Sequence, residues 1–324
     1  MSELKDLDYY SKRIKKLRVD RSRGTAPYQP LLLLALFELV EQEIVTDNRF
    51  PVSPELISIF IKYRNRLSLP KFKADPAQPF YHMSKPKLAF WHLQPKPGHD
   101  LVVQSKSRLN TLQQLRDHIE YGFFDTELFE LLQNPVSRNA LIAQILQVWF
   151  PNKTEELQKI FEVNSFEQLQ LKLKEQGGAV YSVGEIKQEE DVDSFVRDAA
   201  FRRNVIALYN QQCAFCRLRI VGRFNEDIVD GAHIKPFATF RDNRYTNGLA
   251  LCKNHHWAFD RGWFSIDNNY KIVVSSERFK EDALPNTRPM RAFGGEKIAL
   301  PEQERFFPSF EALEWHREYW KIAA

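Results

Sequence analysis

The chain has 324 residues, 43% of them hydrophobic and 27% charged, which is typical of a globular protein long enough for two domains. Its 46 basic and 42 acidic residues leave a net charge of only +4, so bulk charge alone does not indicate nucleic acid as a partner. The charged N-terminus lacks the apolar stretch of a signal peptide, and the longest apolar run, residues 31–37, is far below the ~20 residues that span a bilayer. We therefore expect a cytoplasmic protein without a membrane partner.

The first 152 residues predict a mixed domain in which helices surround a small antiparallel sheet. Apolar residues recur at helical spacing over residues 4–19, 31–43, 53–67, 111–121, 126–132 and 137–150. Short aromatic and β-branched runs, separated by Lys-Pro and Pro-Gly turns, predict the strands at residues 79–83, 90–93 and 101–103. The third helix carries start signals, with Ser53 as N-cap and Pro54 in its first turn.

Residues 153–193 predict a helical bracket followed by a linker. Apolar residues keep helical spacing up to residue 176, whereas Gly177, Gly178 and the acidic residues after them are typical of a linker. Ser194 is then expected to cap a helix that leads into the second domain. The predicted organisation is thus 1–152, 153–193 and 194–324.

All three cysteines of the chain lie in one short window together with two adjacent histidines. Cys213 and Cys216 are spaced so that two thiolates reach one ion, and Cys252 and His255 are i and i+3 at the start of a predicted helix, where they share a face. A full Cys3His shell is typical of structural zinc, because it leaves no open coordination position. The alternative is that the cysteines are simply buried as small hydrophobic residues.

A second set of residues predicts an open metal site. His256 follows His255 on the same helix, so its side chain points about 100° away from the zinc cluster. Asp260 is one turn further on, and this imidazole and carboxylate can hold Mg²⁺ or Mn²⁺ while leaving positions for water and phosphate. His233, at the end of a predicted strand, would face this pair across a hairpin and act as general base, because a neutral imidazole can take a proton from water.

The loop of this hairpin supplies further candidates. Asn247 opens the second strand, and its amide can bridge two backbone or imidazole groups, so we assign it an orienting role. Asp230 is an additional candidate for the metal, acting through water. A phosphate backbone would approach the loop at three basic residues, Lys235, Arg241 and Arg244. A second basic cluster covers residues 12–23, and its part from 12 to 18 is explained equally well as a solvated helix face.

The C-terminal region predicts supporting structure. Residues 263–274 are typical of a β-hairpin with its turn at residues 267–269. A last helix starts at Ser309 and has an apolar side. We expect this helix to dock on the second domain and to have no catalytic role.

The second domain resembles the HNH (ββα-metal) endonuclease superfamily. The resemblance is carried by AHIKP at 232–236, NGLALCKNHH at 247–256 and FDRG at 259–262. It places His233, Asn247 and His256 at the H, N and H positions, and it implies metal-dependent hydrolysis of DNA phosphodiester bonds by a one-metal mechanism. The expected fold is therefore α+β, with a mixed helical N-terminal domain, a small antiparallel sheet and a ββα-metal domain with structural zinc.

The first domain resembles the DNA-reading domain that precedes HNH modules in some bacterial type IV restriction endonucleases. In that family the domain binds DNA with a phosphorothioate backbone, in a shallow pocket of apolar, basic and aromatic groups. The matching stretches give as DNA-binding candidates Arg21, Arg23, Tyr28, Gln29, Pro79, Tyr81 and His82. Phe80 and Phe90 lie in the same region and are better explained as core residues.

Three functions remain open at this level. The first is a restriction endonuclease of type IV that cuts modified, double-stranded DNA, and cleavage of both strands is compatible with a homodimer. The second is an HNH nuclease that reads an unmodified sequence or a methylated base. The third is a zinc-stabilised DNA-binding module without catalysis, which the intact His233, Asn247, His256 and Asp260 disfavour.

Overall fold

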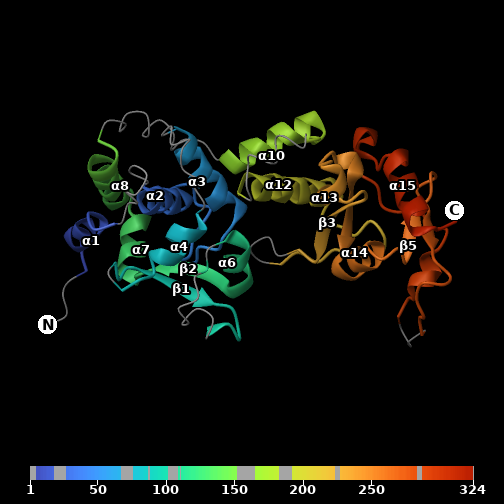
Figure 1. The fold of residues 1–324 in the computed structure, drawn as a ribbon, viewed down its shortest axis with the longest axis horizontal. Coiled ribbons are helices and arrows are strands. Elements are labelled where there is room, and N and C mark those ends of the chain that lie inside the picture. Colours follow the sequence, from blue (N-terminus) through green and yellow to red (C-terminus); the bar gives the residue numbers. More distant parts are fainter. Residues whose placement is uncertain are drawn as a thin grey trace. The chain divides into compact units, whose positions relative to one another are not determined.

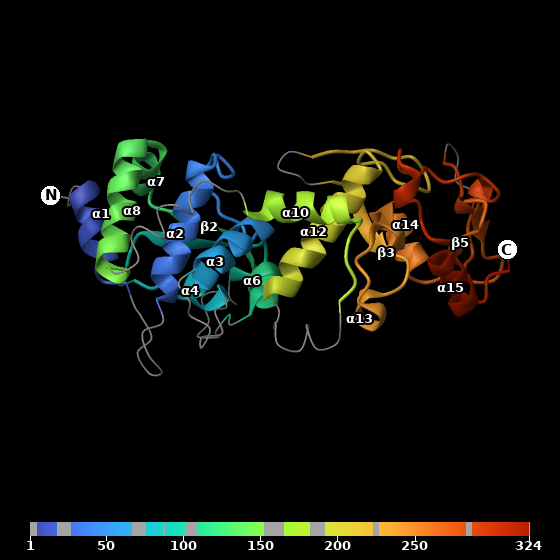
Figure 2. The same cartoon turned by 90° about the horizontal axis from the view of Figure 1, so that it is seen from above.

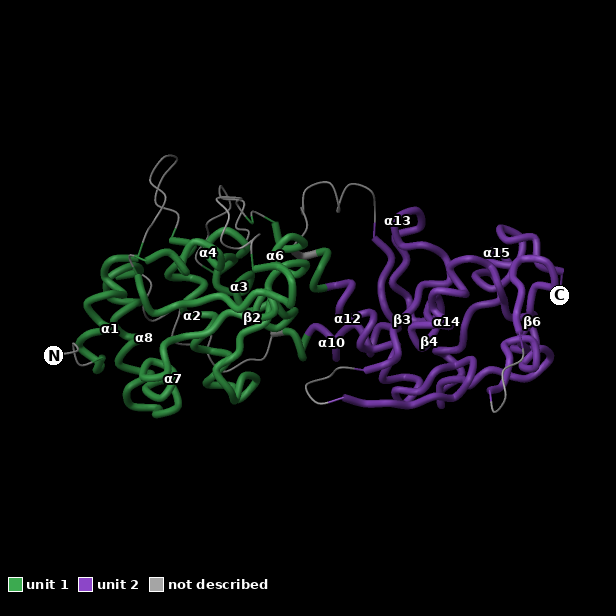
Figure 3. Tube along the Cα trace, turned by 90° about the horizontal axis from the view of Figure 1, so that it is seen from below, with its two compact units in different colours: residues 1–168, 191–196 green, residues 169–190, 197–324 purple. Residues whose placement is uncertain are grey.

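The computed structural model describes residues 5–17, 27–66, 76–86, 88–100, 109, 111–151, 165–181, 192–222, 227–282 and 287–323. The chain divides into two compact units, unit 1 (residues 1–168 and 191–196) and unit 2 (residues 169–190 and 197–324) (Figure 3). Both combine helices with small two-stranded antiparallel sheets, as the predicted α+β class requires. Across these ranges, every helix is too short or too polar to cross a membrane.

Unit 1 is built around a buried helix. Its helices are α1 (Leu7–Ile14), α2 (Tyr28–Glu41), α3 (Pro54–Arg66), α4 (Ala77–His82), α6 (Leu112–His118), α7 (Thr126–Gln133) and α8 (Pro135–Trp149). Helix α2 packs against α3, α4, α7 and α8 (Figure 1), and its side chains from Leu31 to Phe37 are fully buried. The leucine-rich run is thus an interior helix, as its continuous apolar character predicts.

The sheet of unit 1 pairs β1 (Trp91–Pro95) with β2 (Ile119–Phe124). The helix predicted over residues 111–121 was wrong at its end, because it stops at His118 and the chain continues as β2. Aromatic and β-branched residues dominate this stretch, and glycine is required in it. A Cβ on Gly122 would lie 2.1 Å from the Trp91 ring.

The strand predicted at residues 79–83 was also wrong, because most of this stretch belongs to α4. Pro79 lies in the first turn of the helix, where a missing backbone N–H costs nothing. The carbonyl of Phe80 accepts a hydrogen bond from Trp91 Nε1 at 3.0 Å, which fixes the helix on β1. Phe80 and Phe90 are each 1% exposed, so both are core residues. The predicted strand at 101–103 lies outside the described residues.

The remaining elements place the candidate site. They are α10 (Ser165–Gln176), α12 (Val192–Leu208), β3 (Val229–His233), α13 (Phe237–Phe240), η2 (Tyr245–Asn247), β4 (Gly248–Cys252), α14 (Lys253–Phe259), β5 (Phe264–Ile266), β6 (Ile272–Val274), η3 (Met290–Phe293), η4 (Glu304–Phe306) and α15 (Phe310–Trp320). Helix α12 begins at Val192, so Ser194 lies inside the helix and is not its N-cap.

A hairpin between two helices forms the centre of unit 2. Strands β3 and β4 are antiparallel, with His233 opposite Gly248. Two glycines of the hairpin allow α12 to approach closely, since a Cβ on Gly231 would lie 2.7 Å from the backbone of Arg202 and one on Gly248 would lie 2.7 Å from Val205. Helix α14 packs on both strands (Figure 2). The element order from β3 to α14 is therefore the ββα arrangement that the sequence predicts.

The start of the predicted linker is part of this unit. Residues 177–181 pair with residues 241–245, through a bridge between Val180 and Asp242. Gly178 has φ +95°, and a Cβ there would lie 2.2 Å from the Asn243 carbonyl oxygen. These residues are therefore not a free linker. Residues 182–191 lie outside the described part of the chain.

The C-terminal helix docks on unit 2, as predicted. The imidazole of His316 on α15 stacks on Phe259, with 3.8 Å between the ring centroids. Its Nδ1 lies 2.9 Å from Ser265 Oγ, and its Nε2 lies 3.2 Å from the Phe259 carbonyl oxygen. Burial lowers the pKa of His316 to about 4.

This buried histidine predicts a loss of stability in acid. In the unfolded chain its pKa returns to about 6.5, so between pH 6.5 and 4 the unfolded state binds more protons, and stability falls as pH falls, by up to about 3 kcal/mol. We expect His316→Gln, which keeps a partner for Ser265 but carries no charge, to remove this part of the pH dependence. Urea unfolding at pH 7 and pH 4.5 measures it, with His118→Gln as control. An unchanged pH dependence in His316→Gln would show that His316 does not titrate on unfolding.

Candidate functional site

The four predicted zinc ligands come together in one cluster. Cys213 and Cys216 lie in the turn after α12, Cys252 is the N-cap of α14, and His255 lies in its first turn. Their ligand atoms all lie within 4.8 Å of one another. The distances from His255 Nδ1 to the Cys252 and Cys213 sulfurs are 3.0 and 3.8 Å, and 4.0 Å separates the Cys216 and Cys252 sulfurs. Ligands of tetrahedral zinc are about 3.5–3.8 Å apart, so this donor set can hold such an ion.

The turn that carries Cys213 and Cys216, which we call the cysteine knuckle, is also connected to the rest of unit 2. Ala214 N donates to the Ala250 carbonyl of β4 at 2.7 Å, and the Ala214 carbonyl accepts from Ala299 N at 2.8 Å. Phe215 stacks on His255 with 4.1 Å between the ring centroids. The knuckle therefore links the hairpin to the C-terminal segment, and an ion held there would stabilise both.

His256 lies between two carboxylates on the other side of α14. Its Nε2 is 3.6 Å from Asp260 Oδ2, and its Nδ1 is 3.4 Å from Asp230 Oδ2. The side chains of His256 and Asp260 are 21% and 53% exposed, so the group is open to solvent. The two adjacent imidazoles thus serve different sites, as their angular offset predicts: His255 contacts sulfur, and His256 contacts oxygen.

Asp230 contacts His256 directly, although the sequence indicated for it only a contribution to the metal site through water. Burial raises the pKa of its carboxyl group, but hydrogen bonds from His256 and Lys253 outweigh burial and hold the pKa below its usual value. Asp230 therefore stays ionised at neutral pH. Asp230 faces Nδ1 of His256, whereas Asp260 faces Nε2, so the two carboxylates lie beside different nitrogens of one ring. An ion is bound by one of these nitrogens, so the predicted pair for Mg²⁺ or Mn²⁺ is His256 Nε2 with Asp260.

His233 is held on the other face of the hairpin. Its ring stacks on Phe201 of α12, with centroids 4.0 Å apart and an interplanar angle of 7°. Its Nε2 lies 2.7 Å from Asn243 Oδ1, so the neutral ring donates there from Nε2 and carries no proton on Nδ1. Burial lowers the pKa of His233, which keeps the imidazole neutral at physiological pH.

The hairpin separates His233 from the carboxylate group. His233 and Asp230 are three residues apart on β3, and side chains alternate along a strand, so they point to opposite faces. His233 accordingly contacts α12, whereas Asp230 contacts α14. In the described part of the chain no hydrogen bond or ring contact joins His233 to His256. The expectation that these groups act on one phosphate therefore stays a prediction.

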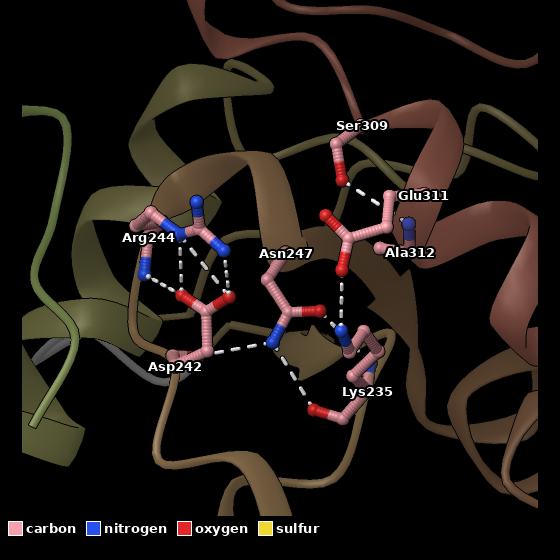
Figure 4. Close-up of polar contacts among 7 residues, drawn as sticks. All are labelled: Lys235, Asp242, Arg244, Asn247, Ser309, Glu311 and Ala312. Atoms are coloured by element: carbon pink, nitrogen blue, oxygen red, sulfur yellow. Dashed lines mark hydrogen bonds and ion pairs between the residues drawn. The ribbon is translucent and has the colours of Figure 1, made fainter. Parts of the chain in front are cut away.

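Asn247 orients the backbone of the loop between the strands (Figure 4). It is 1% exposed. Its Oδ1 accepts from Lys235 N at 2.9 Å, and its Nδ2 donates to the carbonyls of Lys235 and Asp242 at 3.1 and 2.9 Å. The amide thus bridges two backbone segments, while the imidazole of His233 is oriented by Asn243 instead. Sequence reasoning missed Asn243, which is one polar residue among several in the loop.

Substitution of Asn243 tests whether its hydrogen bond positions the imidazole of His233. We expect Asn243→Ala to lower the cleavage rate about tenfold, because a lost hydrogen bond worth about 1.5 kcal/mol frees the imidazole of His233. Asn243→Asp should keep the position but raise the pKa of His233, so that the acid side of the pH–rate profile moves to higher pH. Cleavage rates between pH 5 and 8 measure both effects. A profile that does not move in Asn243→Asp would exclude this contact from the reaction.

Two of the three basic residues in the loop already form ion pairs within the chain. Lys235 Nζ lies 2.8 Å from Glu311 on α15 and is only 12% exposed (Figure 4). The guanidinium of Arg244 pairs with Asp242 at 2.6 Å and is 52% exposed. Arg241 ends α13 in a left-handed conformation, with φ +51°. Contact of these residues with a phosphate backbone stays a prediction, and for Lys235 it requires exchange of its partner.

The DNA-binding candidates of unit 1 differ in how far their side chains are exposed to solvent. Gln29 is 6% exposed in the first turn of α2, and Pro79 is buried in the first turn of α4. Helices α2 and α4 bury both side chains, so contact of Gln29 and Pro79 with DNA stays a prediction and would require these side chains to become exposed. Tyr28, Tyr81 and His82 are partly exposed on the same two helices, which pack together. Arg21 and Arg23 lie outside the described residues.

Comparison with known proteins identifies the domain. Residues 213–267 match the family model of HNH endonuclease, over the cysteine knuckle, the hairpin, α14 and β5. Unit 2 therefore carries an HNH endonuclease domain, the domain of metal-dependent DNA endonucleases. No curated protein matches the chain. Among solved structures, a "Modification dependent TagI restriction endonuclease" matches with a TM-score of 0.29 and 22% identity over 44% of each chain, so this chain spans less than half of that protein.

Proposed function

We propose that the protein is a type IV restriction endonuclease, in which unit 2 hydrolyses DNA and unit 1 reads a DNA modification. The observation that supports the nuclease is His256 between Asp230 and Asp260, one residue after His255 in its sulfur cluster. A module that only binds DNA gains nothing from an open site of this kind. The modification-reading role rests on the sequence resemblance of the first domain.

We assign the two metal sites different roles. Cys213, Cys216, Cys252 and His255 would hold zinc in a closed, structural shell. His256 Nε2 and Asp260 would hold Mg²⁺ or Mn²⁺, with positions left for water and phosphate, and Asp230 would orient the ring from Nδ1. A cation bound there supplies positive charge that stabilises the non-bridging and leaving oxygens of the phosphodiester.

The residues of the hairpin perform the proton transfer. His233 Nδ1 takes a proton from water, the oxygen of that water bonds to phosphorus, and the opposite P–O bond breaks in line. Asn243 holds the imidazole from behind, and Asn247 holds the loop that carries Asn243. This requires the scissile phosphate to lie along the edge of β3, because His233 and Asp230 point to the two faces of that strand.

In unit 1 we assign recognition of phosphorothioate to the surface around Tyr28, Tyr81 and His82, and, from the sequence resemblance alone, to Arg21 and Arg23. Sulfur is larger and less hydrated than oxygen, so partly exposed aromatic edges gain contact with it while basic groups satisfy the phosphate charge. The substrate is double-stranded DNA. Two copies of the chain would be needed to cut both strands at once, which is compatible with a homodimer.

A single comparison of substrates tests these assignments. Duplexes of one sequence that are plain, methylated or phosphorothioated are incubated with the protein and Mg²⁺ or Mn²⁺, with His256→Ala as the inactive control. We expect cleavage of the phosphorothioated duplex only. Equal cleavage of the plain duplex would indicate a reader of unmodified sequence, and preference for the methylated duplex a methylation reader. Binding without cleavage under all conditions would indicate a non-catalytic module.

A further inference from the structure

An aromatic side chain stands on the solvent side of α14, next to the metal-binding residues. Trp257 is 48% exposed and is one of the few large apolar side chains that reach solvent in the described part of the chain. The guanidinium of Arg261 lies 3.8 Å from the centroid of its ring, and Arg261 Nη1 donates to the Trp257 carbonyl at 3.1 Å. The two side chains form one surface, which we call the Trp–Arg pair.

Two further aromatic side chains hold the Trp–Arg pair in place. Trp263 packs edge-on against Trp257, with centroids 5.0 Å apart and an interplanar angle of 90°. Trp263 in turn stacks on Phe279 at 4.8 Å and 11°. A ring fixed in this way loses little conformational entropy when it binds a partner. Unlike Lys235 and Arg244, Arg261 is in no ion pair within the described ranges.

The position of the pair on α14 indicates its partner. Trp257 follows His256 on α14, and Arg261 follows Asp260 in the turn directly after the helix, so each member of the pair is adjacent in sequence to a metal-binding candidate. Because an α-helix with its side chains is only about 10–12 Å wide, the Trp–Arg pair lies within roughly 10 Å of anything bound at His256 and Asp260. At 3.4 Å of duplex axis per nucleotide, this distance is about three nucleotides.

We propose that the Trp–Arg pair is a DNA-binding element that contacts the strand within about three nucleotides of the scissile phosphate. Arg261 binds a phosphate, and the exposed face of Trp257 packs on a neighbouring sugar or base. Such contacts do not depend on sequence, since every nucleotide has a phosphate and an apolar face. This inference rests on the proposed function of unit 2, and it adds Trp257, which lies between the stretches of the HNH string, and Arg261, to which the resemblance gives no role.

Binding is tested in a protein that cannot cut. In the His256→Ala background, we expect Trp257→Ala to weaken binding of plain and modified duplexes equally, by about tenfold, and Trp257→Phe to weaken it about threefold or less. Arg261→Ala should weaken binding about fivefold and reduce the slope of log K against log salt by about one. Quenching of tryptophan fluorescence by DNA should decrease in Trp257→Phe. The affinities and their salt dependence are measured by fluorescence anisotropy of labelled DNA, and melting curves confirm the fold of each variant.

The matched control is Tyr319→Ala, which removes an aromatic ring that is 61% exposed on another helix, α15. It should leave DNA binding unchanged. If the parent protein binds DNA and the Trp257 and Arg261 variants bind as tightly, the inference is overturned and the nuclease assignment stands. If the parent protein binds no duplex and the wild type cuts none, the proposed function itself fails.

Discussion

We expect His233→Ala to lower the rate of DNA cleavage by at least about 100-fold and to leave DNA binding intact, because it removes the group that takes the proton from water. The lowered pKa of His233 sets the pH dependence of the wild type. The neutral imidazole is the active form, so the rate should be flat near pH 7 and fall as pH falls through a pKa below about 6.5. Single-turnover cleavage between pH 5 and 8 measures both the rate and the profile.

The cavity that this substitution leaves provides a positive control. Without the imidazole, Phe201 and Asn243 line an empty space of the right shape, so free imidazole in the buffer should restore part of the rate. Imidazole should not rescue His256→Ala to the same extent, because that residue is assigned to the metal. Retained cutting by His233→Ala without imidazole would remove His233 as the base.

Short-range spacing explains why much of unit 2 could be predicted. The two cysteines of the knuckle are separated by a single turn, and Cys252 and His255 by three residues at a helix start, so local geometry alone directs them to one ion. The same holds for His255 and His256, whose opposite roles follow from the turn angle of a helix. The buried α2 could be predicted for a similar reason, since a continuous apolar run has no face for solvent.

What could not be predicted depends on contacts between distant residues. Asn243 becomes the partner of His233 only because residues 177–181 hold the loop around it. Asp230 reaches His256 only after the hairpin and α14 have packed. In unit 1, β2 follows a helix without a turn signal, and its glycine is explained only by Trp91 on the opposite strand. None of these contacts can be predicted from the sequence around either of the two residues that form it.

The zinc cluster predicts a second large effect. We expect His255→Ala or Cys216→Ser to lose the ion and to lower the melting temperature by more than about 10 °C, because a structural zinc site contributes several kcal/mol to folding. The physical reason is local: without the ion, the knuckle no longer holds β4 to Ala299 through the hydrogen bonds of Ala214. Zinc content by elemental analysis and thermal unfolding measure the two effects.

The neighbouring histidine makes this test specific. His256→Ala should keep its zinc and its melting temperature but lose cleavage, whereas His255→Ala should lose zinc, stability and cleavage together. Added Mg²⁺ should restore activity to protein stripped of weakly bound cations, yet not to protein stripped of zinc. These different outcomes depend on one feature: the two imidazoles are adjacent in sequence but contact different groups. The imidazole of His255 lies 3.0 Å from a sulfur, and that of His256 lies 3.4 Å from a carboxylate oxygen. If both substitutions released zinc, or if neither did, the two-site assignment would be wrong.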